Sequence, residues 1–195
     1  MPRPKSMLRT ILQPLAIAVG LAACARAAMH IYAIPSSSMS PTLEPGDQIV
    51  VTRYFASEPS RGEVIVFRSP LNDEELMVKR VVAVPGELVD SRLGRLRIGN
   101  HTLPEPYVLR PAMTGAIQAQ LVPADSYFVL GDNREDSLDS RSWGVVSRDR
   151  IVGRARLVLW SSSTTHHEIV HAEGDAASNA RARVNGRGRI FKWIE

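Results

Sequence analysis

The sequence predicts a mostly β protein, in which antiparallel strands form a partly open barrel and one N-terminal membrane helix precedes them. Short segments rich in β-branched residues recur along the chain, with glycine or proline between them. No long amphipathic helical pattern separates these segments, which disfavours a parallel α/β sheet. An uncharged apolar run after three basic residues near the N terminus predicts the membrane helix.

Length and charge limit what kind of protein this can be. A chain of 195 residues can bury one good core and carry a small appended subdomain. Residues 31–180 hold 15 basic and 19 acidic side chains, whereas residues 1–30 and the last fifteen residues are strongly basic. This distribution argues against a nucleic-acid partner and fits chain ends that lie near anionic lipid. The single cysteine, Cys24, excludes an intrachain disulfide.

The N-terminal segment has the layout of a membrane anchor. We expect residues 1–10 to be a basic cytoplasmic segment and residues 11–30 to be an uncleaved anchor. The uncharged run is shorter than the roughly 20 residues that span a bilayer comfortably. A cleaved export signal and a lipoprotein signal ending at Cys24 therefore remain as alternatives. Each of the three places the rest of the chain, residues 31–195, outside the cytoplasm.

Six strands are expected after this segment. They cover residues 48–54, 64–67, 77–84, 96–98, 126–130 and 151–160. Pro85-Gly86 ends the third strand. Gly99-Asn100 follows the fourth strand and predicts the turn of a hairpin. Residues 161–188 are mainly small and polar, which predicts a loop.

A serine-rich turn, residues 34–43, comes just before the first of these strands. Pro35 and Pro41 fix the backbone at two points and remove two hydrogen-bond donors, so the serines between them are not ordinary helix or sheet residues. Such a segment is either a polar linker or a rigid turn that presents one serine for reaction.

Two further polar features accompany the turn. Lys79 and Arg80 are neighbours in the third strand and point to opposite faces, so one of them must face the more buried side. A strand lysine is otherwise an ordinary surface residue. The polar segment over residues 131–144 is either a surface turn or a loop that fixes the geometry of a site.

Four motifs occur in an order that resembles one family of proteases. They are Ser-Met-x-Pro-Thr-Leu, Arg-Gly-Glu, Lys-Arg-Val-Val-x-x-Pro-Gly and Gly-Asp-Asn-Arg-x-x-Ser-x-Asp-Ser-Arg. Together they resemble the bacterial type I signal peptidases, the leader peptidase family of Ser/Lys serine proteases, over residues 34–160. Four motifs in the right order are much more specific than any one of them alone.

The resemblance implies an activity and a location. The expected activity is removal of signal peptides from exported preproteins by a serine endopeptidase, after Ala-x-Ala sites. The expected location is the bacterial plasma (inner) membrane, with a single pass, a cytoplasmic N terminus and the catalytic domain on the outer, periplasmic face. Signal peptides and membrane lipid are thus the expected partners, and no cofactor, metal or nucleic acid is expected.

The resemblance also implies a role for individual residues. Ser38 is the expected nucleophile and Lys79 the general base, while the Ser36 hydroxyl and the Ser38 backbone N–H form the oxyanion hole. The residues expected to orient and support the lysine are Ser137, Asp139 and Arg141. The residues expected to line shallow apolar pockets for the substrate are Tyr32, Ile34, Met39, Leu43, Ile49, Val66, Met77 and Val78.

The proposed chemistry requires a neutral Lys79 amine, whatever the family. Free lysine titrates near ~10.4, so at pH 8 only roughly one amine in 250 is neutral. Burial among apolar neighbours such as Val78, Val81 and Val82 lowers that pKa, because the charged form loses its solvation. A shift of about 3 units makes the amine a competent base and costs about 4 kcal/mol of folding stability.

The sequence departs from the family pattern in three places that bear on the site. Ser37 stands where glycine is common, and we favour Ser38 as nucleophile because it directly precedes Met39. Glu135-Asp136 replaces the Asp-Asn pair that is typical of the family. The Asp136 carboxylate would raise the pKa of Lys79 if it pointed at the amine, but alternation suggests that Asp136 points away while Ser137 points in. The short middle section predicts a reduced second β subdomain over residues 85–123.

Three other functions remain as alternatives. The segment His167-Glu168-Ile169-Val170-His171 matches the HExxH zinc-protease pattern, but its polar surroundings do not favour the required helix. A member of the same family could be specialised for one substrate, such as a conjugative pilin. A lipoprotein β domain that only binds a partner is the non-enzymatic alternative. The basic, aromatic tail over residues 189–194 is expected at the lipid surface.

Overall fold

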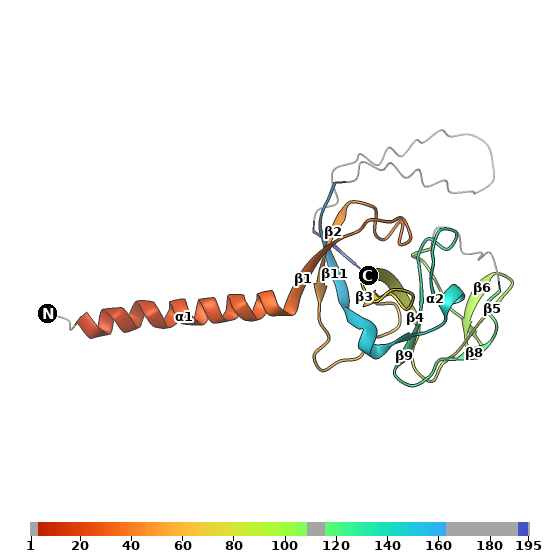
Figure 1. Ribbon diagram of the computed structural model, residues 1–195, viewed down its shortest axis with the longest axis horizontal. Coiled ribbons are helices and arrows are strands. Elements are labelled where there is room, and N and C mark those ends of the chain that lie inside the picture. Colours follow the sequence, from red (N-terminus) through yellow and green to blue (C-terminus); the bar gives the residue numbers. More distant parts are fainter. Residues whose placement is uncertain (1–3, 109–115, 163–190, 195) are drawn as a thin grey trace.

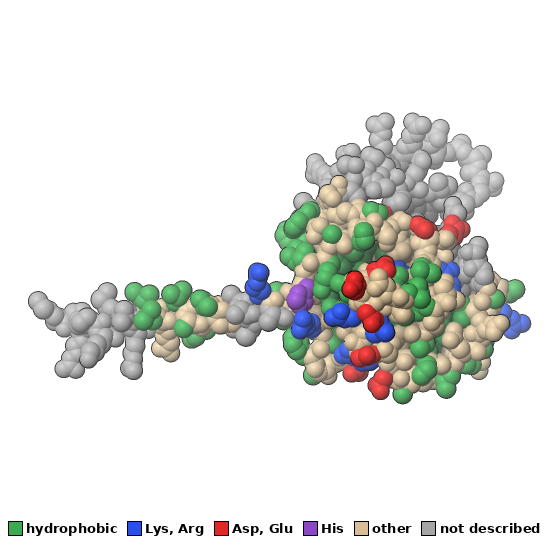
Figure 2. Space-filling view, viewed as in Figure 1, with side chains coloured by type: hydrophobic (Ala, Val, Ile, Leu, Met, Phe, Trp, Pro, Cys, Tyr) green, Lys and Arg blue, Asp and Glu red, His purple; other side chains and the backbone are tan. Residues whose placement is uncertain are grey.

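The computed structural model describes residues 4–108, 116–162 and 191–194. A single long helix, α1 (Pro4–Ala28), runs into the first strand and projects from the β structure (Figure 1). The apolar side chains Ile11, Leu12, Leu15, Ile17 and Val19 along this helix are between 52% and 62% exposed (Figure 2).

The helix differs from the expected anchor over residues 11–30. Its last residue is Ala28, and Met29 and His30 already belong to the first strand. In the described part of the chain, no helix is both long enough and apolar enough to cross a membrane. The prediction of an N-terminal membrane helix is therefore not supported by the structure.

The main sheet contains eight antiparallel strands and carries most of the fold. Its strand order is β1-β2-β11-β3-β4-β9-β10, and β12 pairs with β11 outside this path. The strands are β1 (Met29–Ala33), β2 (Asp47–Thr52), β3 (Val64–Arg68), β4 (Leu76–Ala83), β9 (Ser126–Leu130), β10 (Val146–Ser147), β11 (Ile151–Ser161) and β12 (Lys192–Trp193). Strands β3 and β9 and the second part of β4, residues 79–83, are almost continuously buried because both faces of the sheet are covered there.

A second, four-stranded sheet lies within residues 85–123, on the side of the molecule opposite α1 (Figure 1). Its order is β7-β6-β5-β8, and its strands are β5 (Leu88–Arg92), β6 (Arg95–Ile98), β7 (His101–Thr102) and β8 (Gln120–Leu121). One apolar cluster joins this sheet to the main one, because Val89 and Leu96 pack in the same buried group as Phe128 and Leu130. The two sheets thus share a core.

The two faces of the main sheet have separate cores. The first core includes Ile34, Met39 and Val66, and it covers the face on which the serine-rich turn lies. The second includes Ile65, Phe67 and Tyr127. Neighbouring residues of β3 belong to different cores because successive side chains of a strand point to opposite faces.

The mostly antiparallel β fold predicted from the sequence is confirmed. Each of the six expected strands is present, with ends shifted by one or two residues, and the turn at Gly99-Asn100 joins β6 to β7. Strands β1, β5, β8, β10 and β12, the short helix α2 (Ser140–Trp143) and the 3₁₀ turn η1 (Arg148–Arg150) were not predicted. The HExxH segment and residues 163–188 of the predicted loop lie outside the described residues.

Charged side chains of both signs are interspersed on the face of the β structure beside α1 (Figure 2). The ion pairs of the described residues include Arg148 with Glu58, in which the Glu58 side chain is 70% exposed. An exposed pair of this kind contributes little to stability, about 0–1 kcal/mol.

Candidate active site

The serine-rich turn is fixed at both ends by backbone hydrogen bonds between the chain entering it and the chain leaving it. The Ile34 N–H donates to the Asp47 carbonyl at 2.8 Å, and the Gly46 N–H donates to the Ile34 carbonyl at 2.8 Å. Met39 and Leu43 are buried in the first core and anchor the turn from within. Ser36 is exposed and Ser38 half-buried, so these two hydroxyls lie at the surface of a rigid turn rather than in a flexible linker.

Lys79 reaches this turn from β4, where it pairs with Ile65 of β3. Its Nζ lies 2.8 Å from Ser38 Oγ and 3.0 Å from the carbonyl oxygen of Val78. The lysine is only 3% exposed. A buried amine in hydrogen-bond contact with a serine hydroxyl has the geometry that a nucleophile and its base require.

Burial lowers the pKa of Lys79 to about 8, because the ammonium form loses its hydration. The carboxylates of Asp139, Asp132, Glu75 and Asp136 act in the opposite direction, with Asp139 the strongest of them. Burial lowers the pKa of Lys79 by more than the four carboxylates together raise it. At pH 8 about half of the Lys79 amines are therefore neutral, compared with a fraction of a per cent for free lysine.

A polar loop between β9 and α2 packs against the serine turn. The Asn133 N–H donates to the Ser38 carbonyl at 3.1 Å, and the Asn133 side-chain amide donates to the Ser37 carbonyl at 3.2 Å. Gly131 makes this approach possible, since a Cβ at that position would lie 2.5 Å from the Ser38 carbonyl oxygen and 2.2 Å from Ser137 Oγ. Only glycine fits between the loop and the turn.

The fully buried carboxylate of Asp139 holds the other end of this loop. It accepts two hydrogen bonds from the Arg141 guanidinium, both at 2.8 Å, and one from the Gly131 N–H at 3.0 Å. It also caps α2 by accepting from the Arg141 N–H. Arg141 in turn donates to the carbonyl of Ser137 at 3.3 Å. The predicted pair Asp139–Arg141 thus fixes the loop rather than touching the lysine directly.

The structure brings most of the predicted polar residues together, with one exception. Ser36 Oγ lies 3.3 Å from Ser38 Oγ, and within the described residues the Ser38 backbone N–H donates no hydrogen bond. Ser137 Oγ is buried close to the Ser38 carbonyl, yet it has no hydrogen-bond partner in the described part of the chain. The expected hydrogen bond from Lys79 to Ser137 is therefore not formed in this structure.

The predicted pocket residues fall into two groups. All except Met77 belong to the first core or pack against it, whereas Met77 packs in the second core, because it alternates with Val78 along β4. Leu43 and Ile49 have no exposed surface at all. These two can only support a pocket from beneath, while Tyr32 and Val78 are partly exposed and free to contact a bound peptide.

Arg80 and Asp132 form a buried ion pair that the sequence analysis did not assign to the site. The guanidinium donates to the carboxylate at 2.9 Å and 2.7 Å, and it also donates to the carbonyl of Gly62 at 2.7 Å. Both Lys79 and Arg80 are buried, where only one was expected to be. Arg80 is tolerated inside because its charge is paired and because it stacks at 4.0 Å over the ring of Tyr107.

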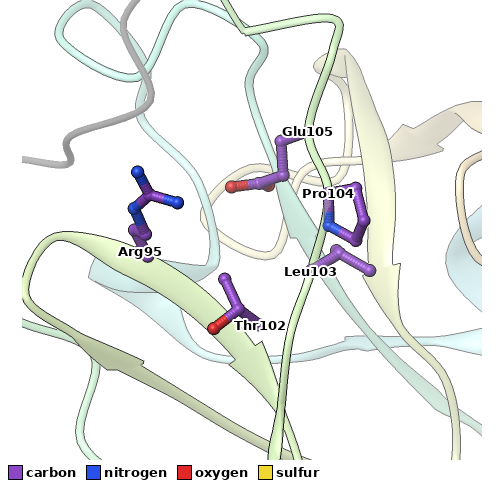
Figure 3. Close-up of a pocket in the computed structure, with 5 residues that line it drawn as sticks. All are labelled: Arg95, Thr102, Leu103, Pro104 and Glu105. Carbon is purple, nitrogen blue, oxygen red and sulfur yellow. The ribbon is translucent and has the colours of Figure 1, made fainter.

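A second buried pair connects the polar loop to the small sheet. Arg134 donates to the carbonyl of Gly131 at 2.9 Å and pairs with Glu105, which follows β7. Glu105 and Arg95 also face a cavity of about 300 Å³ at the edge of the small sheet (Figure 3). This cavity does not include Ser38 or Lys79 among its lining residues, so it is separate from the candidate site.

Comparison with known proteins identifies the family. The model of the family described as "Signal peptidase, peptidase S26" matches residues 7–160. The chain belongs to the signal peptidase I family. It is 38% identical over 162 residues to a signal peptidase I of Leptolyngbya laminosa, with 78% of each chain covered. It is 33% identical to signal peptidase IB of Staphylococcus aureus strain Mu50, over 71% of this chain and 81% of that protein.

The chain is also similar to a plant peptidase and to a protein of known structure. The thylakoidal processing peptidase 1 of Arabidopsis thaliana is 34% identical over 71% of this chain and 44% of its own length. A crystal structure of a signal peptidase I from Enterococcus faecalis V583 matches with 33% identity and a TM-score of 0.45, covering 50% of this chain and 97% of that one. As a member of this family, the chain is a serine endopeptidase that acts on the signal peptides of preproteins.

Proposed function

We propose that this signal peptidase uses Ser38 as its nucleophile and the neutral amine of Lys79 as its general base. The observation that supports this most strongly is the 2.8 Å contact between Lys79 Nζ and Ser38 Oγ. The contact suits both protonation states, because a charged amine donates to the hydroxyl and a neutral amine accepts its proton. Burial supports the neutral state at the pH at which the enzyme would work.

In this mechanism, Ser38 Oγ attacks the scissile carbonyl carbon while its proton passes to Lys79 Nζ. The oxygen of the tetrahedral intermediate becomes negative and is stabilised by the Ser36 hydroxyl and the Ser38 N–H. The intermediate collapses as the ammonium gives its proton to the leaving amine of the mature protein. Water, deprotonated by the same amine, then hydrolyses the ester between Ser38 and the signal peptide.

The remaining polar residues have supporting roles in this proposal. Asp139 and Arg141 hold the loop in place, and through its contacts with Gly131 and Ser137 this pair fixes the wall beside Lys79. Ser137 Oγ, buried and without a partner among the described residues, is available to accept a hydrogen bond from the amine once Ser38 has reacted. No metal ion or cofactor is needed for any step.

We further propose that cleavage follows small residues in an Ala-x-Ala arrangement. The predicted pocket residues Ile34 and Met39 are 4% and 1% exposed and belong to the closely packed first core, a setting that favours small side chains beside the serine. A substrate in extended conformation could add to the sheet beside Tyr32 and Val78, and small side chains at alternating positions would then face the apolar wall.

Location at the outer face of the bacterial plasma membrane is also part of the proposal. The support is a row of uncovered apolar side chains along α1, preceded by basic residues, immediately before the strand that leads into the serine turn. Exposed Phe191 and Trp193 add apolar surface at the C-terminal end, although β12 pairs with β11. A substrate whose signal segment lies in lipid would then meet the site at the membrane surface.

Cleavage of a panel of exported preproteins tests this function. The full chain, in detergent and with anionic lipid vesicles, is expected to cut several preproteins after Ala-x-Ala and to float with the vesicles. Changing the alanine before the cut to phenylalanine is expected to lower kcat/KM by at least about 100-fold, because the wall cannot accommodate a ring. A metal chelator is expected to leave the rate unchanged.

Three results would contradict the proposal. Cleavage of only one preprotein in the panel would indicate an enzyme specialised for a single substrate. Loss of activity with the chelator would favour a metalloprotease and the HExxH segment. Equal rates with alanine and phenylalanine before the cut would rule out the small-pocket explanation of specificity.

A further inference from the structure

Two polar residues beside the candidate site, neither of which takes part in the proposed reaction, meet in this structure. Ser37 lies directly before the proposed nucleophile, and Asp136 lies directly before Ser137 in the polar loop. The Ser37 hydroxyl donates a hydrogen bond to Asp136 Oδ2 at 2.6 Å, although the two residues are 99 positions apart. This hydrogen bond links the residue beside the proposed nucleophile to a carboxylate of the polar loop.

The backbone around this contact is well constrained. Asn133 donates to the carbonyls of both Ser37 and Ser38, and the Asp136 N–H donates to the Asn133 carbonyl at 3.2 Å. The serine turn and the polar loop are therefore joined at several points, among them the Ser37–Asp136 and Thr42–Asp132 hydrogen bonds. This arrangement gives the Asp136 carboxylate a defined position rather than the free rotation of a surface side chain.

The position of this carboxylate matters because Lys79 is nearby. The acidic groups that act on Lys79 are Asp139, Asp132, Glu75 and Asp136. Asp139 is paired with Arg141 and Asp132 with Arg80, so both of these charges are largely compensated. Glu75 and Asp136 are exposed, and neither forms an ion pair in the described part of the chain. Of these two, Asp136 lies on the loop that contacts the serine turn, and it is free to turn if its serine partner is lost.

We propose that Ser37 is a positioning residue whose hydrogen bond holds the Asp136 carboxylate away from the Lys79 amine. This inference rests on the proposed function, in which Lys79 is the base. Within the described residues, Lys79 makes no ion pair, and its hydrogen bonds go to Ser38 and the Val78 carbonyl instead. Without the Ser37 hydroxyl, the carboxylate would lose its donor and be free to turn toward Lys79, where it would favour the charged, inactive form of the amine.

The prediction concerns the acidic limb of the pH profile of kcat/KM, measured on a peptide substrate at low ionic strength. Ser37→Ala is expected to move this limb up by about 0.3 pH unit, and Asp136→Asn is expected to move it down by a similar amount. At acidic pH each shift corresponds to about a twofold change in rate, a decrease for Ser37→Ala and an increase for Asp136→Asn. In the Asp136→Asn background, Ser37→Ala is expected to cause no further shift.

Glu135→Gln is the matched control, because it removes a charge from the adjacent exposed position of the same loop. Glu135 is not among the groups that shift Lys79, so this variant is expected to keep the limb in place. Ser37→Thr retains a hydroxyl and is expected to retain the wild-type profile. High salt is expected to shrink the shift of Ser37→Ala, since exposed charges are screened.

Several outcomes would overturn the inference. An unmoved limb in Ser37→Ala, or the same shift with and without Asp136, would show that the hydroxyl does not act through the carboxylate. If Ser37→Ala does not fold, an Asp136→Asn profile identical to wild type would also overturn it. Full activity of a Lys79→Ala variant would instead overturn the proposed function, and the inference with it. If Lys79→Ala is inactive but the acidic limb stays in place in Ser37→Ala and Asp136→Asn, the inference about Ser37 would be overturned and the proposed function would stand.

Discussion

Ser38→Ala is expected to lower kcat/KM for signal-peptide cleavage by at least about 10⁴-fold while leaving the fold intact. The hydroxyl is the only one in contact with the Lys79 amine in the described residues, and removing it leaves no nucleophile beside the base. The side chain is half-buried and small, so its loss creates little strain. Steady-state cleavage of a purified preprotein measures the rate, and circular dichroism checks the fold.

The neighbouring serine provides the control for this experiment. Ser37 donates to Asp136 rather than to Lys79, so Ser37→Ala is expected to stay within about threefold of the wild-type rate near the optimal pH. Lys79→Ala is expected to be as inactive as Ser38→Ala, because the two residues act as one unit. If Ser37→Ala were the inactive variant and Ser38→Ala the active one, the assignment of the nucleophile would be wrong.

Asp132→Ala is expected to destabilise the protein by about 3–5 kcal/mol. Removal of this carboxylate takes the Asp132 charge away from the Arg80 guanidinium, which is buried and only 1% exposed. Its contacts with the Gly62 carbonyl, the Thr42 hydroxyl and the Tyr107 ring are with uncharged groups. Urea denaturation of the two proteins, followed by tryptophan fluorescence, gives the difference in the free energy of unfolding.

An exposed ion pair of the same type provides the comparison. Glu58 pairs with Arg148 at the surface, where its side chain is 70% exposed, and Glu58→Ala is expected to cost at most about 1 kcal/mol. A loss of less than about 1 kcal/mol for Asp132→Ala would mean that water reaches Arg80. The description of Arg80 and Asp132 as a buried, closely paired couple would then be wrong.

Local patterns in the sequence were sufficient to predict most of the main sheet. The strands over β2, β3, β4, β9 and β11 combine β-branched residues with turn residues at their ends, and each is present. Strand β1 was missed because its residues, Met29–Ala33, continue the apolar segment and looked like part of an anchor. Strands β5 and β8 are short and partly polar, and they form only because the second sheet pairs them.

The candidate site was predictable in its parts but not in its contacts. The motifs drew attention to Ser38, Lys79 and the loop containing Asp139, and the structure brings these elements together. Sequence alternation could not reveal that Arg80 is buried as well, because its partners Asp132 and Tyr107 come from distant segments. The sequence also gave no indication of the Ser37–Asp136 hydrogen bond, because this contact depends on how the loop over residues 131–144 packs against the serine-rich turn.

The central claim is that burial keeps the Lys79 amine largely neutral beside the Ser38 hydroxyl. The most direct test is the titration of that amine by NMR in the full chain, with lysines labelled at the side-chain nitrogen and Lys79→Met used to assign the signal. The account predicts a midpoint at about pH 8, so that activity rises as the pH increases toward and through this value. A midpoint at the ordinary lysine value of about 10.4 would contradict it, because the amine would then be charged at any pH at which the enzyme works.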